Sequence, residues 1–138
     1  MSEIVVGYDG TKGAKAALDK AVEFAKALGD RIVIVFGYAP GGYGGGEVPT
    51  HREAVKEMGE KVTQEANEVV TAAGVEHEVQ LLNESGAEAL NDVATQRKAR
   101  MIVVGSYGES PLKGAVLGTT AYRLVHVAEL PVLVVPVE

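Results

Sequence analysis

The stretch EIVVGYDGT at residues 3–11 places three consecutive aliphatic residues shortly before a polar turn that contains glycine. Consecutive apolar residues, without polar alternation, are typical of a strand that is covered on both faces. We therefore predict a buried strand over Glu3–Tyr8, followed by a turn. In that turn, Asp9 and Thr11 are expected to cap the helix that follows.

The rest of the chain repeats this order of strand and helix. Further strands are predicted at Ile32–Phe36, Glu76–Leu82, Met101–Val104 and Val132–Val135. Helices are predicted between Ala14 and Leu28, over roughly His51–Ala73, over Ala87–Lys98 and near Thr119–Ala128. Regular alternation predicts an α/β fold: an open, doubly wound, five-stranded parallel sheet with helices on both faces. We expect strand order 3-2-1-4-5 in a single domain over residues 1–138.

Details of the pattern give more specific expectations. Glu76–Leu82 alternates polar and apolar residues, so this strand is expected at a half-exposed edge of the sheet. Gly29 stands where the cap at the end of the first helix belongs. Residues expected to face the sheet are Val55, Met58, Val62, Val69 and Ala73 on the second helix, and Ala121, Leu124, Val125 and Ala128 on the fourth.

Composition excludes several classes of function. The 138 residues include no cysteine, so disulfides and thiolate chemistry are absent, and the three histidines lack the spacing of a metal cluster or a catalytic triad. The net charge is −6 without a basic run, so no nucleic-acid partner is expected. Apolar runs are too short to span a bilayer, and the first residues do not resemble a signal peptide. We therefore expect a cytoplasmic protein without a dedicated catalytic apparatus.

A ligand site is predicted where the winding of the sheet reverses. Ligands of open parallel sheets bind beyond the carboxyl ends of the strands at this point. Two loops meet there: Asp9-Gly10-Thr11, and the segment after the fourth strand, which carries GSYG at 105–108, Lys113 and GTT at 118–120. Glycine lets the backbone approach a ligand closely, and a helix that starts at GTT offers free amides to an anion. These residues favour a phosphate-bearing ligand, although glycines at such positions also serve simply as turns.

These segments resemble the universal stress protein family, over nearly the whole chain. The resemblance is carried by the opening strand and turn at 6–11, by Gly105-x-x-Gly108 followed after nine residues by Gly118-Thr119, and by LPVLVVP at 130–136. It implies a fold of the adenine nucleotide alpha-hydrolase-like type. It also implies a site for ATP or another adenine nucleotide, with Mg²⁺ at the phosphates.

The resemblance also implies a role for individual residues. Asp9 would lie at the adenosine end, the turn at Gly37-Tyr38 would contact the adenine, and the glycines of the second loop would hold ribose and phosphates. The complete set of candidate binding residues is Asp9, Gly10, Thr11, Gly37, Tyr38, Gly105, Gly108, Lys113, Gly118, Thr119 and Thr120. The chain departs from the family pattern at Gly37, where an aliphatic residue is usual, and at Glu109, whose charge would repel an anion.

Three functions are compatible with these features. The leading hypothesis is a nucleotide-binding stress-response protein that acts as a regulatory or interaction module. Family resemblance implies a homodimer formed through the last strand, where Val132 and Val134 provide an apolar edge. The second hypothesis is a dimeric interaction protein that binds no nucleotide. The third, a slow ATP hydrolase, is less favoured because the pyrophosphate loop of such enzymes is absent after the first strand.

Overall fold

Strands and helices alternate throughout the residues that the computed structural model describes, which are 1–37, 49–82, 86–106 and 119–137. The strands are β1 (Glu3–Gly7), β2 (Arg31–Gly37), β3 (His77–Leu82), β4 (Met101–Gly105) and β5 (Val132–Val135). The helices are α1 (Lys12–Leu28), α2 (Pro49–Ala72), α3 (Gly86–Gln96) and α4 (Thr119–Val127). The predicted elements are confirmed, with one- or two-residue differences at some ends.

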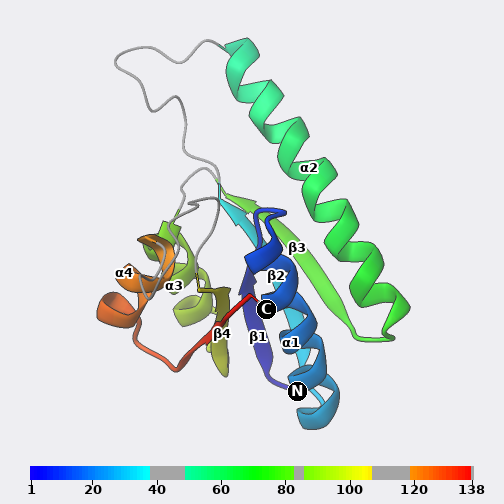
Figure 1. The fold of residues 1–138 in the computed structure, drawn as a ribbon, viewed down its shortest axis with the longest axis vertical. Coiled ribbons are helices and arrows are strands. Elements are labelled where there is room, and N and C mark those ends of the chain that lie inside the picture. The colour runs from blue at the N-terminus through cyan, green and yellow to red at the C-terminus, as the bar shows by residue number, and fades with distance from the viewer. Residues whose placement is uncertain (38–48, 83–85, 107–118, 138) are drawn as a thin grey trace.

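The five strands form one parallel sheet in the order β3-β2-β1-β4-β5. Figure 1 shows α1 and α2 on one face of this sheet and α3 and α4 on the other. The predicted doubly wound fold and strand order are therefore confirmed. The winding of the chain reverses at β1 and its neighbour β4, and in open parallel sheets ligands bind beyond the carboxyl ends of such strands.

The core consists of two layers separated by the sheet. Ile4 and Val6 of β1 pack beneath α1 and α2, whereas Val5 points to the side of α3 and α4. None of the three side chains has any exposed surface. The edge strand β3 differs, since all of its residues are only partly buried, as its alternating sequence predicts.

The end of α1 also follows the expectation from the sequence. Gly29 adopts a left-handed φ of 72° and its N–H donates to the carbonyl of Ala25, which closes the last turn. Glycine tolerates this φ without the steric cost that a side chain would incur.

Two predictions about the buried faces of helices are wrong. Val69 on α2 and Val125 on α4 were expected to face the sheet, but they are 43% and 51% exposed. Among the α2 residues whose side chains are described, those buried are Gly59, Thr63, Ala66 and Val70, whereas the side chains of Val55 and Met58 lie outside the described residues. Most of these residues are small, and an added Cβ at Gly59 would lie only 2.7 Å from the ring of Phe36. The buried face of α2 is therefore the one whose small residues let the helix pack closely on the sheet, not the one with the largest apolar side chains.

An ionic network at the amino ends of the strands joins three of them to Arg97, the residue that follows α3. Arg97 donates to both carboxylate oxygens of Glu3, at 2.8 and 3.0 Å, and to Glu78 at 2.5 Å. Arg31 donates to Glu3 at 3.0 Å and lies 3.4 Å from Glu78. The hydrogen bonds from Arg97 are the main reason that the pKa values of Glu3 and Glu78 lie below their ordinary range.

A second ion pair at this end of the sheet satisfies a buried charge. The carboxylate of Asp30 is 1% exposed and receives two hydrogen bonds from Arg100, at 2.5 and 3.2 Å. A buried carboxylate without such a partner would be costly. Arg100 therefore has a structural role immediately before β4.

We expect Arg97→Met to destabilise the protein at pH 7 by about 1–2 kcal/mol, because Glu3 and Glu78 lose charged hydrogen bonds. Because the pKa values of Glu3 and Glu78 are lowered by folding, their ion pairs stabilise the protein at any pH above the pKa of the unfolded state. This stabilisation is lost as the pH falls through the pKa values of the folded state. The difference between wild type and variant should therefore shrink toward about pH 3. Urea unfolding at both pH values tests this.

The matched control is Arg123→Met. Arg123 pairs with Glu88, but both side chains are about half exposed, so its loss should change stability little. A penalty for Arg97→Met that is the same at both pH values would contradict the electrostatic explanation.

Candidate functional site

The turn between β1 and α1 is held by its own side chains. Oδ1 of Asp9 accepts hydrogen bonds from the backbone N–H of Thr11 at 3.0 Å and from the Thr11 hydroxyl at 2.6 Å. The Thr11 hydroxyl oxygen in turn accepts from the N–H of Ala14 at 3.2 Å and caps α1. The capping expected from the sequence is confirmed. Among the described residues, the second carboxylate oxygen of Asp9 has no partner, and Asp9 is exposed.

Gly10 shapes this turn by its backbone conformation. Its φ is +82°, in the left-handed region that side chains rarely adopt. An added Cβ would also lie 3.1 Å from Val62 of α2. The turn therefore lies close to α2, and glycine suits both this conformation and this contact.

Gly105 allows the end of β4 to lie directly against the first turn of α1. A Cβ at this position would be 2.6–2.9 Å from three backbone atoms of Gly13. No real Cβ tolerates such contacts with backbone, so glycine is required here for packing. The structure therefore gives this candidate residue a structural role and brings it beside the turn that contains Thr11.

The register of the sheet brings one further residue to this edge. β1 and β4 pair Ile4 with Met101 and Val6 with Val103, so Ser106 follows β4 at the same edge of the sheet at which Asp9 follows β1. The N–H of Ser106 donates to the carbonyl of Val135 at 2.9 Å, which holds its backbone in line with the sheet. Ser106 was not among the predicted site residues, although it lies inside the GSYG segment that predicted the site.

On the other side of β1, Gly37 ends β2 at the same edge. Gly7 pairs with Val35, and the N–H of Tyr8 donates to the carbonyl of Val35 at 2.9 Å. Gly37 lies two residues beyond Val35, as Asp9 lies two residues beyond Gly7. The sheet thus places Asp9, Gly37 and Ser106 at the carboxyl ends of three neighbouring strands, β1, β2 and β4.

The remaining candidates are only partly described. Thr120 lies, partly buried, in the first turn of α4, on the face of the sheet opposite α1. Thr119 begins α4, but its side chain lies outside the described residues. Four further candidates lie entirely outside the described residues: Tyr38, Gly108, Lys113 and Gly118.

The described part of the site offers oxygen acceptors, hydroxyls and backbone donors. One carboxylate oxygen of Asp9 accepts hydrogen bonds, and the hydroxyls of Thr11 and Ser106 lie nearby in the chain or register. The charge of Asp9 opposes a phosphate and suits the hydroxyls of a sugar. Within the described ranges, no group of three or more His, Asp or Glu residues is arranged to hold a metal ion.

Residues 1–136 match the universal stress protein family. The chain belongs to this family. A universal stress protein from Thermus aquaticus, encoded in the 3′ region of a QAH/OAS sulfhydrylase, is 35% identical over 133 residues, covering 96% of each chain.

Solved universal stress proteins share the fold. One from Archaeoglobus fulgidus superposes with a TM-score of 0.81 at 25% identity, covering 98% of each chain. A universal stress protein in complex with cAMP superposes with a TM-score of 0.79 at 25% identity, covering 99% of this chain and 98% of that one. As for membrane association, the described part of the chain contains no helix that combines the length and apolarity needed to cross a bilayer.

We expect Gly105→Ala to destabilise this universal stress protein by about 1–3 kcal/mol, because its methyl group would meet the backbone of Gly13. Gly74→Ala is the control, since Gly74 has a φ of +75° but nothing within 4 Å of an added Cβ. The Gly74→Ala variant should lose less stability than Gly105→Ala, because it suffers only from the unfavourable φ of alanine at this position. Chemical denaturation compares the two, and a smaller loss for Gly105→Ala than for Gly74→Ala would contradict the packing role.

Proposed function

We propose that this universal stress protein binds an adenine nucleotide, ATP with Mg²⁺, at the carboxyl edge of its sheet. The nucleotide would control its contacts with a partner in the cytoplasm, as a regulatory or interaction module. The observation that carries the proposal is the Asp9 turn, whose outward carboxylate oxygen lies at the reversal point of the sheet. Further support comes from the cAMP-bound relative, which superposes over nearly the full chain.

The proposed roles follow from the chemistry of each residue. Asp9 accepts hydrogen bonds from ribose hydroxyls, while Gly10 and Thr11 keep its carboxylate in place. Gly37 and Tyr38 contact the adenine. The ribose and phosphates are bound by Gly105, Gly108, Lys113, Gly118, Thr119 and Thr120, largely through backbone amides and the N-terminal end of α4.

The described residues are compatible with Mg²⁺ but provide few ligands for it. Mg²⁺ commonly binds through one or two carboxylates together with substrate phosphates and waters. Asp9, Thr11 and Ser106 provide oxygen atoms of suitable kind at this edge. When bound, the ion would neutralise phosphate charge, which lessens the repulsion between the phosphates and Asp9.

Thermal unfolding with and without ATP and Mg²⁺ tests the proposal. A ligand that binds only the folded state adds about 2.7 kcal/mol at a hundred times its dissociation constant, which raises the unfolding midpoint by several degrees. We expect a rise of this size, and mass analysis should find adenine nucleotide released from the purified protein. No shift at millimolar ATP and no released nucleotide would contradict nucleotide binding.

The variant Asp9→Asn tests the site itself. Asparagine keeps an oxygen for the Thr11 hydrogen bonds but replaces the second acceptor oxygen with an NH₂ donor. We expect the dissociation constant for ATP to rise about tenfold, the effect of losing roughly one charged hydrogen bond. Asp92→Asn, an exposed residue of α3, removes the same charge elsewhere and should leave affinity unchanged. Calorimetric titration of both variants measures this.

Two other results, one from these titrations and one from an ATP hydrolysis assay, would change the proposal. Equal weakening in the Asp9→Asn and Asp92→Asn variants would remove Asp9 from it. ATP turnover that is proportional to protein concentration and lost in Asp9→Asn would instead make the protein a slow ATP hydrolase.

A second candidate function, a dimer that works through its interface, is favoured by the edge strand β5. Val132, Leu133 and Val134 are only partly buried, and β5 pairs with β4 on one side. The carbonyls of Pro131 and Val135 accept hydrogen bonds from β4, so the backbone groups of Val132 and Val134 point to the opposite edge. Such an edge provides hydrogen bonds for a second copy of the chain.

The variant Val134→Pro tests this interface. Proline removes the outward N–H of residue 134 while the hydrogen bonds of Pro131 and Val135 to β4 remain possible. We expect the wild type to sediment as a dimer and this variant as a monomer. A wild-type monomer at high concentration, or a dimer unaffected by the substitution, would contradict pairing through β5.

A further inference from the structure

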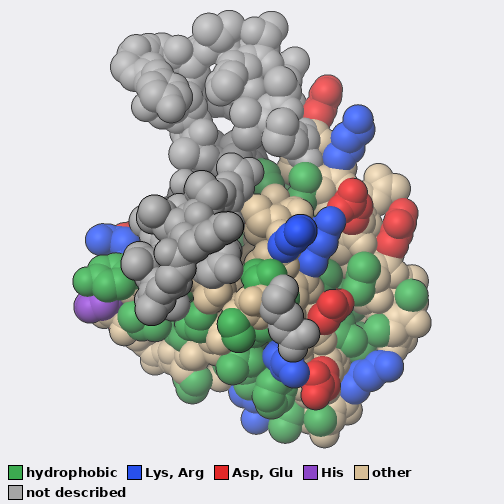
Figure 2. Space-filling view, viewed as in Figure 1, with side chains coloured by type: hydrophobic (Ala, Val, Ile, Leu, Met, Phe, Trp, Pro, Cys, Tyr) green, Lys and Arg blue, Asp and Glu red, His purple; other side chains and the backbone are tan. Residues whose placement is uncertain are grey.

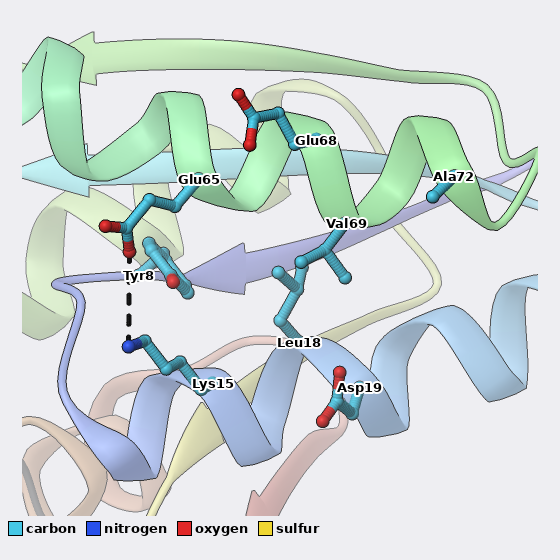
Figure 3. Close-up of a pocket in the computed structure, with 8 residues that line it drawn as sticks. All are labelled: Tyr8, Lys15, Leu18, Asp19, Glu65, Glu68, Val69 and Ala72. Atoms are coloured by element: carbon cyan, nitrogen blue, oxygen red, sulfur yellow. Dashed lines mark ion pairs between the residues drawn. The ribbon is translucent and has the colours of Figure 1, made fainter.

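A groove of about 560 Å³ lies between α1 and α2 and extends along these helices from Tyr8, the residue that follows β1. Figure 3 shows Leu18 and Val69 along its middle, with Tyr8 at one end and Ala72 toward the other. Its volume falls within the range of small-molecule sites. The proposed nucleotide site does not use these residues.

Tyr8 places a polar group at the bottom of this groove. Its side chain is only 4% exposed, yet its hydroxyl points into the groove and has no hydrogen-bond partner among the described residues. The ring of Tyr8 is packed in the core while its hydroxyl is left at the groove, where a ligand can form a hydrogen bond with it. Burial, followed by the nearby charges of Glu65, Asp9 and Asp19, raises the pKa of Tyr8, so its hydroxyl stays protonated.

The groove carries an excess of negative charge. Asp19 from α1 and Glu65 and Glu68 from α2 line it, against the single cation Lys15. Lys15 lies 4.0 Å from Glu65, and both side chains are more than half exposed, so this pair holds its members weakly. Asp19 and Glu68 have no ion-pair partner among the described residues. Figure 2 shows acidic and basic side chains interspersed over the α1 and α2 side of the molecule, so the excess of negative charge is confined to the groove lining.

The shape of the groove restricts the ligand. From Glu65 to Ala72, α2 advances about 10 Å, so the groove is elongated. Its apolar floor is made by Leu18, Val69 and Ala72, and its carboxylates lie on both rims. A chain of methylene groups would cover this floor, while cationic groups along the chain would meet the carboxylates.

We propose that the groove between α1 and α2 binds a linear organic cation of the polyamine type. One ammonium group donates hydrogen bonds to Glu65 and to the hydroxyl oxygen of Tyr8, and further ammonium groups lie near the carboxylates of Asp19 and Glu68 on the two rims. The methylene chain covers Leu18 and Val69. A basic peptide has similar charge, but a recess of this length accommodates a small molecule better than an extended polypeptide.

Calorimetric titration of the full chain with spermidine at low salt, in nucleotide-free buffer, tests the proposal. Tyr8→Phe removes only the hydroxyl and keeps the buried ring, and it should weaken binding about fivefold. The double variant Asp19→Asn/Glu68→Gln should weaken it about tenfold. Lys15→Gln removes the competing cation and should strengthen binding about threefold, which is the opposite direction.

A control separates the groove from general attraction to an acidic protein. Asp92→Asn/Glu129→Gln removes the same two charges from exposed positions outside the groove, and it should change spermidine affinity less than about twofold. Equal weakening in both double variants, or no effect of Tyr8→Phe, would overturn the proposal. Tighter binding of an oligolysine peptide, lost in the same groove variants, would overturn it in favour of a protein partner.

Discussion

The complete burial of the three aliphatic side chains at the centre of β1 is the constraint on which the rest of the structure depends. Ile4 and Val6 face one helical layer and Val5 the other, so the strand is stable only with both faces covered. β1 consequently lies at the middle of the sheet, with the chain winding away from it on either side. The turn after β1 thereby lies at the reversal point, where its side chains are accessible to a ligand.

Much of this fold was predictable because the burial of a strand determines the pattern of apolar residues along it. Unbroken apolar runs mark the inner strands, and the alternation of β3 marks a half-covered edge. The buried face of α2 was harder to predict, because Gly59, Thr63 and Ala66 have little apolar bulk. They are buried since small residues let the helix approach the sheet, and Val69 is left partly exposed as a result. A pattern that counts bulky apolar residues misses such a contact.

In the candidate site, too, contacts between residues close in sequence were easier to predict than contacts between distant segments. The sequence DGT is enough to predict the hydrogen bonds of Asp9 and Thr11, since they form within three residues. The positions of Ser106 and of Gly105 against Gly13 depend on the register between strands far apart in the chain. Gly105 was interpreted from its loop as a ligand contact, but its packing against α1 already requires glycine.

The ionic network at the amino ends of the strands has a consequence for how such a protein changes during evolution. The sheet is stabilised at the end opposite the carboxyl edge by ion pairs among Glu3, Arg31, Glu78 and Arg97. The pair of Asp30 and Arg100 lies at the same end. Mutations in the loops beyond the carboxyl ends of the strands therefore leave these ion pairs intact. Descendants of one ancestral chain are free to acquire new ligand preferences at that end while inheriting an unchanged scaffold.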